Sequence, residues 1–594
     1  MSFKMATSCI SGSMYKNILA FLVVIMISTG FWGRAQNPVL PDSSFSYQAP
    51  LDMDLYLAGN FGELRNNHFH AGLDFKTQGT VNHPVYSFAD GYVCRVGINA
   101  LGYGIVAYVR HPQLGLTSVY AHLNDFNDAI NEKLRAQQIA REENNIQVVF
   151  QPGELPVKMG DVIAKSGNTG SSGGPHVHFE LRDCNDEDDE FYNPMPFFRD
   201  RISDRKPPRA SHVYFYPLGG VVNGLTGRQS ASVIVTQTGQ RTINKRITAW
   251  GRIGLGIKAF DYIENMANTY GVYSVELYVD DRLVYHFTCD RFRYSERKYT
   301  NSLTDYRGWV NNRFMIQKSF IEPANYLRMI DRSLGDGTIE INEERDYPFR
   351  YVLTDAHGNK SEVEFRVKGK KSLLPRDPYK DVKAGTFLTK GILVRVEEPL
   401  DFDSAGCRIQ MPAGNLYTTT ELPFRRTVHN DPQRPCISPV YAVGNTSLPC
   451  HRSYSLTIPV PKAYADTLTQ PEKLYIANLD DGYVGGKYKN GAVQVRLSEF
   501  GHFAVRRDQS KPTGTIVSMT WNRAQISVAD KGSGVARYKV FIDGHFVPFD
   551  LNRYGKRIGH PRYYGIQRGK MHDVKIWGVD HCGNENTIHL KKFF

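Results

Sequence analysis

The chain has 594 residues, of which 41% are hydrophobic and 22% charged, which excludes a disordered chain and predicts several folded domains. Its 72 basic and 60 acidic residues give a net charge of +12 without a compact basic cluster, so we expect no nucleic acid as a partner. The charge either keeps the chain in solution or favours an anionic surface. Abundant Tyr (34), Phe (32) and Gly (52) predict a mainly β fold.

The first 35 residues have the features of a secretory signal peptide. An unbroken apolar run at 18–27 follows Lys16, and Gly33 and Ala35 stand at the small-residue positions of a cleavage site. The run is too short to span a membrane comfortably, so we expect cleavage after about Ala35 and no stable transmembrane segment afterwards. An uncleaved anchor is the alternative, and Met14 is an alternative start. Export would place the protein in the periplasm or cell envelope.

Seven cysteines remain after such a cleavage, and their spacing fits neither a zinc knuckle nor a CxxC motif. Cys436 and Cys450 lie close enough in sequence to predict a disulfide in an oxidising compartment. We interpret the others as buried thiols.

Residues 36–57 form an extended, proline-containing leader, and residues 58–200 the first predicted domain. Short β-runs alternate there with glycine turns, for example at 84–89, 91–96 and 104–109.

One stretch of this domain, at 124–143, breaks the β pattern. It is rich in helix-forming residues, and Ile130, Leu134 and Ile139 recur on one helical face. We therefore predict a helical insertion between strands, with Asp125 as its N-cap.

After a charged linker at 201–209, we predict that the rest of the chain forms β modules. A weak repeat relates 276–284 to 539–547, and an Asp-x-x-Gly-Asn sequence follows each copy, at 355–359 and 580–584. The repeat predicts Ig-like β-sandwiches at 210–370, with an insertion near 291–344, and at 512–594, around a β-rich domain at 380–508. We interpret the Asp-x-x-Gly-Asn sequences as turns, with calcium binding as the alternative.

Three short segments of the first domain are rich in histidine: 68–75, 119–123 and 173–180. The last follows a glycine-rich turn at 167–174. This turn lacks the Gly-Lys-Ser/Thr ending of a phosphate loop, and its small residues would let the backbone approach a peptide closely.

The spacing within these segments suits a metal site. On strands, residues two or four apart share a face, so His70 with Asp74, and His176 with His178, can each point to one side. Zinc in a catalytic site takes three such ligands and leaves a position for water. Because His68-Phe69-His70 is itself an HxH motif, spacing alone chooses neither between His68 and His70 nor between His176 and His178.

Hydrolysis by a zinc-activated water also needs a base and a donor for the oxyanion. His122 and His176 suit these roles. No H-E-x-x-H helix is present, which excludes a thermolysin-like site with a Glu base.

Taken in order, HxGxD, YAHL and HxHFE resemble the motifs of the lysostaphin-type (LytM-type) zinc endopeptidases, which cut peptidoglycan cross-links. The resemblance covers about residues 58–200 and includes Gly91-Tyr92-Val93, Tyr103-Gly104, 156–164 and 167–170. It implies an antiparallel β peptidase domain with one Zn²⁺ ion. It further implies the roles of five residues: metal ligands His70, Asp74 and His178, and catalytic histidines His122 and His176. His68 falls outside the pattern, and we expect it either behind the metal ligands or at the rim of the site.

The resemblance and the signal peptide together predict an exported zinc metalloendopeptidase that hydrolyses peptide cross-links in peptidoglycan peptide stems. The 124–143 insertion departs from the family pattern and either gates the substrate groove or is a surface ornament. The acidic run at 186–190 is a solvated loop or steers substrate or metal. Two rival functions are an envelope scaffold, acting on the wall or an envelope protein partner through the C-terminal modules, and cleavage of a non-wall protein.

Overall fold

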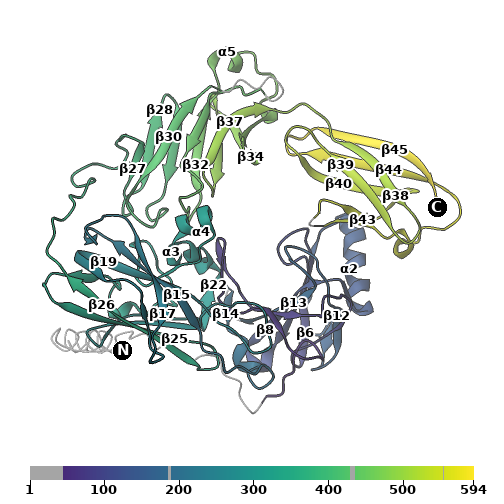
Figure 1. The fold of residues 1–594 in the computed structure, drawn as a ribbon. Coiled ribbons are helices and arrows are strands. Elements are labelled where there is room, and N and C mark those ends of the chain that lie inside the picture. Colours follow the sequence, from purple (N-terminus) through teal and green to yellow (C-terminus); the bar gives the residue numbers. More distant parts are fainter. Residues whose placement is uncertain (1–44, 185–188, 429–434, 553) are drawn as a thin grey trace, which may run out of the picture. The chain divides into compact units, whose positions relative to one another are not determined.

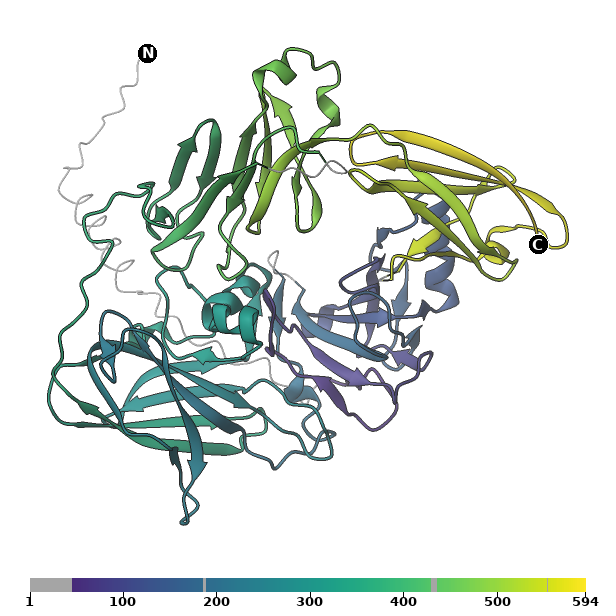
Figure 2. The same ribbon diagram turned by 45° about the horizontal axis from the view of Figure 1, so that its top comes forward.

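The computed structural model describes residues 45–184, 189–428, 435–552 and 554–594. The predicted signal peptide, the start of the leader and most of the acidic run at 186–190 lie outside these residues. Strands make up 46% of the structure and helices 9%, so the predicted mainly β fold is confirmed (Figures 1 and 2). Among the described residues, no helix is both long and apolar enough to cross a membrane.

An antiparallel sheet in the N-terminal part holds the predicted site. Its path is β1-β4-β13-β8-β7-β6-β10. The strands are β1 (Leu57–Gly59), β4 (Leu73–Lys76), β13 (His176–Asp183), β8 (Leu116–Leu123), β7 (Ile105–His111), β6 (Gly91–Ile98) and β10 (Gln147–Val149). Every residue of β8 is buried, as are all of β13 except Asp183. Side chains on these two strands therefore occupy fixed positions.

Shorter strands complete this region. β2 (Leu64–Arg65) pairs with β3 (His68–Phe69), β11 (Pro156–Val157) pairs with β6, and β5 (Pro84–Tyr86), β12 (Val162–Lys165) and β9 (Asp125–Phe126) form a small sheet. A 3-10 turn, η1 (Pro112–Leu114), connects β7 to β8, and η2 (Met195–Phe197) follows the domain's last strand.

The predicted helical insertion is α2 (Asp128–Arg141), visible in Figure 1. Its N-cap is Asn127, whose side chain accepts a hydrogen bond from the amide of Ile130, so the prediction of Asp125 was wrong. Asp125 lies two residues earlier, in β9.

The inward face of α2 differs in part from the predicted one. Ile130 and Leu134 are buried, but Ile139 is 48% exposed. Gln138 takes an inward position instead and donates to the carbonyl of Asn144 (2.8 Å). A hydrogen-bonded glutamine thus fills a position that the apolar pattern did not reveal.

The N-terminal sheet extends into the sequence that follows the linker. β14 (Glu190–Tyr192) pairs with both β13 and β22 (Arg291–Arg293), and β14 and β22 lie side by side in Figure 1. Phe292 of β22 packs against the rings of Phe61, Phe69 and Phe191, at centroid separations of 5.3, 5.4 and 5.1 Å. The predicted insertion at 291–344 is therefore joined to the first sheet.

The remaining helices of the described chain are short. They are η3 (Tyr294–Tyr299), α3 (Thr300–Leu303), α4 (Tyr306–Asn312), η4 (Arg332–Leu334), α5 (Lys462–Ala465), η5 (Pro471–Lys473) and η6 (Pro561–Tyr564).

Most of the strands between residues 209 and 369 share one path, β18-β17-β15-β19-β26-β25-β20-β21. They are β15 (Arg209–Pro217), β17 (Gln229–Val235), β18 (Arg241–Ile243), β19 (Ile247–Phe260), β20 (Ser274–Val279), β21 (Arg282–Thr288), β25 (Asp346–Thr354) and β26 (Lys360–Gly369). β16 (Val221–Val222), β23 (Gln317–Lys318) and β24 (Ile339–Ile341) attach to β19. The predicted two-residue turn joins β20 to β21, and both of its residues, Asp280 and Asp281, have positive φ.

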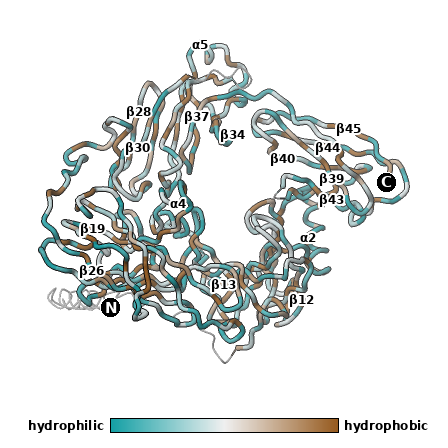
Figure 3. The backbone as a smooth tube through the Cα atoms, in the orientation of Figure 1, coloured by the Kyte–Doolittle hydropathy of each residue, from teal (hydrophilic) through white to brown (hydrophobic). Residues whose placement is uncertain are grey.

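The C-terminal half contains two further pairs of sheets with separate cores. The first pair comprises β27 (Gly391–Val394), β28 (Leu400–Ser404), β29 (Cys407–Met411), β30 (Thr420–Thr427), β31 (Val440–Val443), β32 (Tyr454–Pro459), β33 (Leu474–Asn478), β34 (Gly482–Gly485), β35 (Lys487–Lys489), β36 (Ala492–Leu497) and β37 (Gly501–Arg507). The second comprises β38 (Thr513–Met519), β39 (Ala524–Ala529), β40 (Val535–Ile542), β41 (His545–Phe546), β42 (Phe549–Leu551), β43 (Arg557–Gly559), β44 (Met571–Asp580) and β45 (Glu585–Phe593). Figure 3 shows hydrophobic positions distributed along the strands.

The predicted disulfide between Cys436 and Cys450 is wrong. All seven cysteines from Cys94 onwards are thiols in the structure. The buried thiol of Cys450 instead donates to the carbonyl of Arg452 (2.9 Å).

Candidate metal centre

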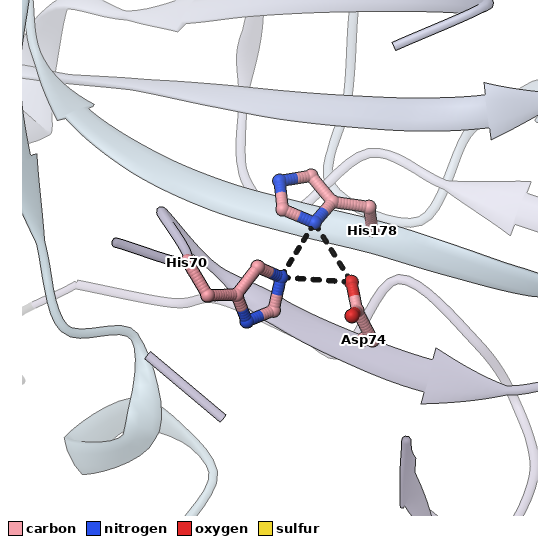
Figure 4. A group of neighbouring side chains, drawn as sticks. All are labelled: His70, Asp74 and His178. Carbon is pink, nitrogen blue, oxygen red and sulfur yellow. Dashed lines mark hydrogen bonds and ion pairs between the residues drawn. The ribbon is translucent and has the colours of Figure 1, made fainter. Parts of the chain in front are cut away.

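His70, Asp74 and His178 converge on one point (Figure 4). His70 Nε2 lies 3.0 Å from Asp74 Oδ1 and 3.0 Å from His178 Nδ1, and the last two atoms are 2.8 Å apart. All three residues are buried, with 1–4% of their surface exposed. Two imidazole nitrogens and one carboxylate oxygen therefore form a compact triangle.

Strand pairing sets two corners of this triangle. His178 of β13 lies directly opposite Asp74 of β4 in the antiparallel register. His176 is two residues before His178 on the same strand, and both side chains point to the same side, as the sequence predicts.

The third corner is reached differently from the prediction. His70 lies between β3 and β4 rather than on a strand, so strand alternation does not explain how it meets Asp74. The short connection that follows lies tightly against β13: a Cβ on Gly72 would stand 2.1 Å from the carbonyl oxygen of Phe179. Glycine is therefore required at position 72 for His70 to reach the triangle.

His122 and His176 stand beside the triangle, with their ring centroids 4.7 Å apart. His176 Nε2 lies 3.5 Å from Asp74 Oδ1. His122 has a φ of 60°, in the left-handed region that few non-glycine residues adopt and that is common at functional sites. The structure thus brings together all five predicted site residues.

Each of these four imidazoles is hydrogen-bonded through the ring nitrogen that points away from the centre. The bonds are His70 Nδ1 to Asn60 O (2.6 Å), His122 Nδ1 to Thr169 O (2.9 Å), His176 Nδ1 to Gly174 O (2.8 Å) and His178 Nε2 to Glu180 Oε1 (2.8 Å). Carbonyl and carboxylate oxygens only accept, so the outward nitrogens carry protons, and in the neutral form of each ring the inward nitrogen carries a lone pair.

This arrangement fits a metal ion. With both rings neutral, the inward lone pairs of His70 and His178 and the Asp74 oxygen would approach within 3.0 Å, which is repulsive unless a metal ion or a proton on His178 lies among them. Outward hydrogen bonds of this type fix the tautomer and orientation of metal-binding histidines.

Burial keeps His70 and His122 neutral. It lowers the pKa of His70 to about 4 and that of His122 to about 3. His178 behaves differently: although burial opposes its charge, Asp74 and Glu180 raise the pKa of His178 to about 9, so a metal would have to displace its inward proton. Neutral imidazole is the form that binds a metal or accepts a proton.

Glu180 has a structural role that the sequence analysis did not assign. It is fully buried and accepts hydrogen bonds from His178, from the Tyr103 hydroxyl (2.6 Å) and from Arg182 Nε (2.7 Å). Although burial opposes ionisation, Arg182 and these hydrogen bonds lower the pKa of Glu180 to about 2. Its position two residues after His178 on a predicted strand could have indicated this role from the sequence.

Asn60 and Arg65 were also missed. Arg65 Nη2 donates to the second oxygen of Asp74 (2.8 Å). The Asn60 side chain exchanges two hydrogen bonds with the backbone of Gly271 (2.8 and 3.0 Å), while its carbonyl holds His70. No local pattern indicates a contact between residues 211 positions apart.

A pocket of about 730 Å³ opens over the centre. His70, His122 and His178 line it, and the opposite walls include residues of 294–313 and 445–450. His68 lines the pocket but stays outside the triangle, and its Nδ1 bonds to Asn66 O.

Helix α2 contributes no residue to the pocket walls. Glu142, which caps its C-terminus, instead forms an ion pair with Lys539 (2.6 Å). The interpretation of the insertion as a gate therefore has no support in the structure.

Comparisons with known proteins match parts of the chain. The DD-carboxypeptidase/endopeptidase Mpg of Neisseria meningitidis serogroup B is 35% identical over 114 residues, which are 19% of this chain and 20% of that protein. An uncharacterized metalloprotease of Haemophilus influenzae is 38% identical over 113 residues, 19% of this chain and 18% of that protein. The chain thus spans about a fifth of the length of the curated relatives it matches.

The N-terminal part of this chain is similar to the LytM-type peptidase family. The solved catalytic domain of lysostaphin from Staphylococcus simulans matches 26% of this chain and 98% of that chain, at 22% identity and a TM-score of 0.20. A Zu5-like domain model matches residues 392–508. The part of the chain that resembles this family contains a His-Asp-His group able to hold a metal.

Proposed function

We propose that this protein is an exported zinc metalloendopeptidase that hydrolyses peptide cross-links of bacterial peptidoglycan. One observation supports the enzymatic part: His70 Nε2, Asp74 Oδ1 and His178 Nδ1 lie within 3.0 Å of one another. Hydrogen bonds from their outward nitrogens hold both imidazole rings in this orientation. Three ligands of this kind are typical of catalytic zinc, whereas structural zinc sites are closed by four protein ligands.

When bound, zinc supplies a Lewis acid that activates water and polarises a peptide carbonyl. His122 and His176 then divide the proton transfers. Their rings are adjacent, and their inward nitrogens carry lone pairs. One ring accepts the proton of the attacking water, and the other, once protonated, stabilises the oxyanion or donates to the leaving amine.

The substrate class and the export rest on different support. The wall peptide follows from the motif resemblance and from the endopeptidase name of the Neisseria relative. Export follows from the predicted signal peptide.

Incubation with cross-linked peptidoglycan, followed by mass analysis of the released fragments, tests the proposal. Wild type in zinc-replete buffer is expected to release peptide fragments that Asp74→Ala and His178→Ala do not. His68→Ala is the matched control, because this histidine lines the same pocket outside the triangle and should retain most activity.

Absence of any fragment that depends on Asp74 and His178 would refute the proposed function. If a glycine-rich peptide is cut while the wall fragments stay intact, the protein is a peptidase whose substrate is a protein and not the cell wall.

A further inference from the structure

A second cluster of ligand-type atoms lies where the linker meets the β-strands that follow it. Asp204, Asp355 and His357 bring a carboxylate or imidazole atom each to within 4.8 Å of the others. Asp204 belongs to the predicted linker, and the other two lie in the loop between β25 and β26. A third carboxylate, that of Asp261 directly after β19, is not part of this group, but the negative charge of Asp355 acts on it.

Two of these carboxylates are buried without a full set of donors. Asp204 is 8% exposed and Asp261 is 4% exposed. Among the described residues, no donor reaches Asp204 Oδ2 or Asp261 Oδ1. A buried carboxylate oxygen left without a partner is strongly unfavourable, so a positive charge beside either atom would stabilise it.

The histidine of the cluster presents a third open position. His357 Nε2 bonds to the carbonyl of Ile202 (2.7 Å), which fixes the proton on Nε2 in the neutral ring. Its Nδ1 lone pair then faces Asp204 Oδ2 at 3.9 Å, a separation suited to two ligands of one ion rather than to a hydrogen bond.

The electrostatics agree with this geometry. Burial and the negative charge of Asp355 raise the pKa of Asp261 to about 8, and burial raises the pKa of Asp204. Both carboxylates would be ionised more readily with a cation beside them.

The last β module contains a matching cluster that is fully satisfied. Asp508, Asp530 and Asp580 also lie within 4.8 Å of one another. Asp508 accepts from the amides of Ser510 and Ser533, Asp530 from Gly532 and Gly534, and Asp580 from the amide and side chain of Asn584. Asp355 is satisfied within its Asp-x-x-Gly-Asn turn just as Asp580 is, so the two clusters differ at Asp204, whose Oδ2 has no donor among the described residues.

We propose that Asp204, Asp355 and His357 bind a divalent cation that fastens the linker to the β-strands of residues 209–369, with the charge of Asp261 adding to its attraction, and that the cluster of the last module does not. Two carboxylate ligands, with the charge of Asp261 nearby, favour calcium, which prefers oxygen ligands and tolerates irregular geometry. The imidazole nitrogen would also accept zinc or manganese.

Hydrogen bonds connect Asp261 to the histidine-rich site. Asp261 forms two backbone hydrogen bonds with Tyr270 (2.9 and 3.0 Å), and the next residue, Gly271, holds the side chain of Asn60. Asn60 in turn accepts the hydrogen bond from His70.

Native mass spectrometry and thermal melting of the full-length, zinc-loaded protein test the proposal, with calcium, manganese and zinc each titrated. Wild type is expected to hold one divalent ion beyond the peptidase metal, identified by its mass. A hundredfold excess over the dissociation constant should raise the melting temperature by roughly 5 °C. Asp204→Asn combined with Asp261→Asn should lose both effects, whereas Asp508→Asn combined with Asp530→Asn should keep them.

The double variant also reports on its own folding. Without added ions it should melt no lower than wild type, because the substitutions remove repulsion between buried carboxylates. Wild type that binds no second ion, or a double variant that still binds one, would overturn the proposal and leave protonated carboxylates as the explanation of the cluster.

Discussion

The inward nitrogens of four histidines fall into two groups with different consequences. Those of His70 and His178 lie within 3.0 Å of Asp74 Oδ1, whereas that of His176 lies 3.5 Å away. The His122 ring lies 4.7 Å from that of His176 and is held by the carbonyl of Thr169. Metal binding and proton transfer should therefore be separable by mutation.

His122→Ala is expected to retain zinc but to lower the rate of peptide cleavage by about 10²–10⁴-fold, because it removes only a proton-transfer group. Asp74→Ala should lose the zinc itself. Metal content by mass spectrometry and fragment release, measured on the same samples, check both. Loss of zinc in His122→Ala would show that His122 is a ligand instead.

His111 gives a pH prediction away from the metal. It is fully buried at the end of β7, and burial lowers its pKa to about 4. The unfolded chain takes up this proton near pH 6.5 and the folded chain only near pH 4, so stability falls as the pH drops between these values. The cost reaches about 2.5 kcal/mol at pH 4.5.

His111→Gln removes this titration. The gap in unfolding free energy between wild type and variant should therefore be smaller at pH 4.5 than at pH 7 by that amount, as measured by urea unfolding at both values. An unchanged gap would contradict the assigned pKa.

The site residues could be predicted from the sequence where their positions depend on local spacing alone. His176 and His178 share a face because β13 is a regular strand. His70 was placed on a strand that does not include it, since the need for Gly72 comes from the backbone of Phe179 more than 100 residues away. The contact of Asn60 with Gly271 is equally non-local.

Among the elements, β22 links the pocket wall of residues 294–313 to the sheet that carries the ligands. Its Phe292 is 1% exposed and contacts Phe69, the residue before His70. The β pattern of this region could be predicted, but the pairing of β22 with β14 could not, because it joins strands about 100 residues apart. The N-cap of α2 was missed by two residues because both Asp125 and Asn127 are good capping types.

Phe292→Ala is expected to destabilise the protein by about 3–5 kcal/mol, as for other buried phenylalanines. It should also lower cleavage activity, because the cavity loosens Phe69 next to His70. Phe314→Ala, on a ring that is 42% exposed, is the control and should change the melting temperature little. Equal effects of the two substitutions would exclude a role of β22 in supporting the site.

At the scale of the whole molecule, the peptidase site and its supports come from separate parts of the sequence. The ligands lie between residues 70 and 178, while Gly271 and Phe292 support them from beyond the linker. We therefore expect the peptidase site to need the sequence after the linker for full activity.

The most direct test of the central claim is fragment release from peptidoglycan by the full-length protein before and after removal of its metal. Release should stop when metal analysis shows no zinc and return when one equivalent of zinc is added back. Undiminished release by metal-free protein, or no release by protein with one zinc bound, would contradict this claim.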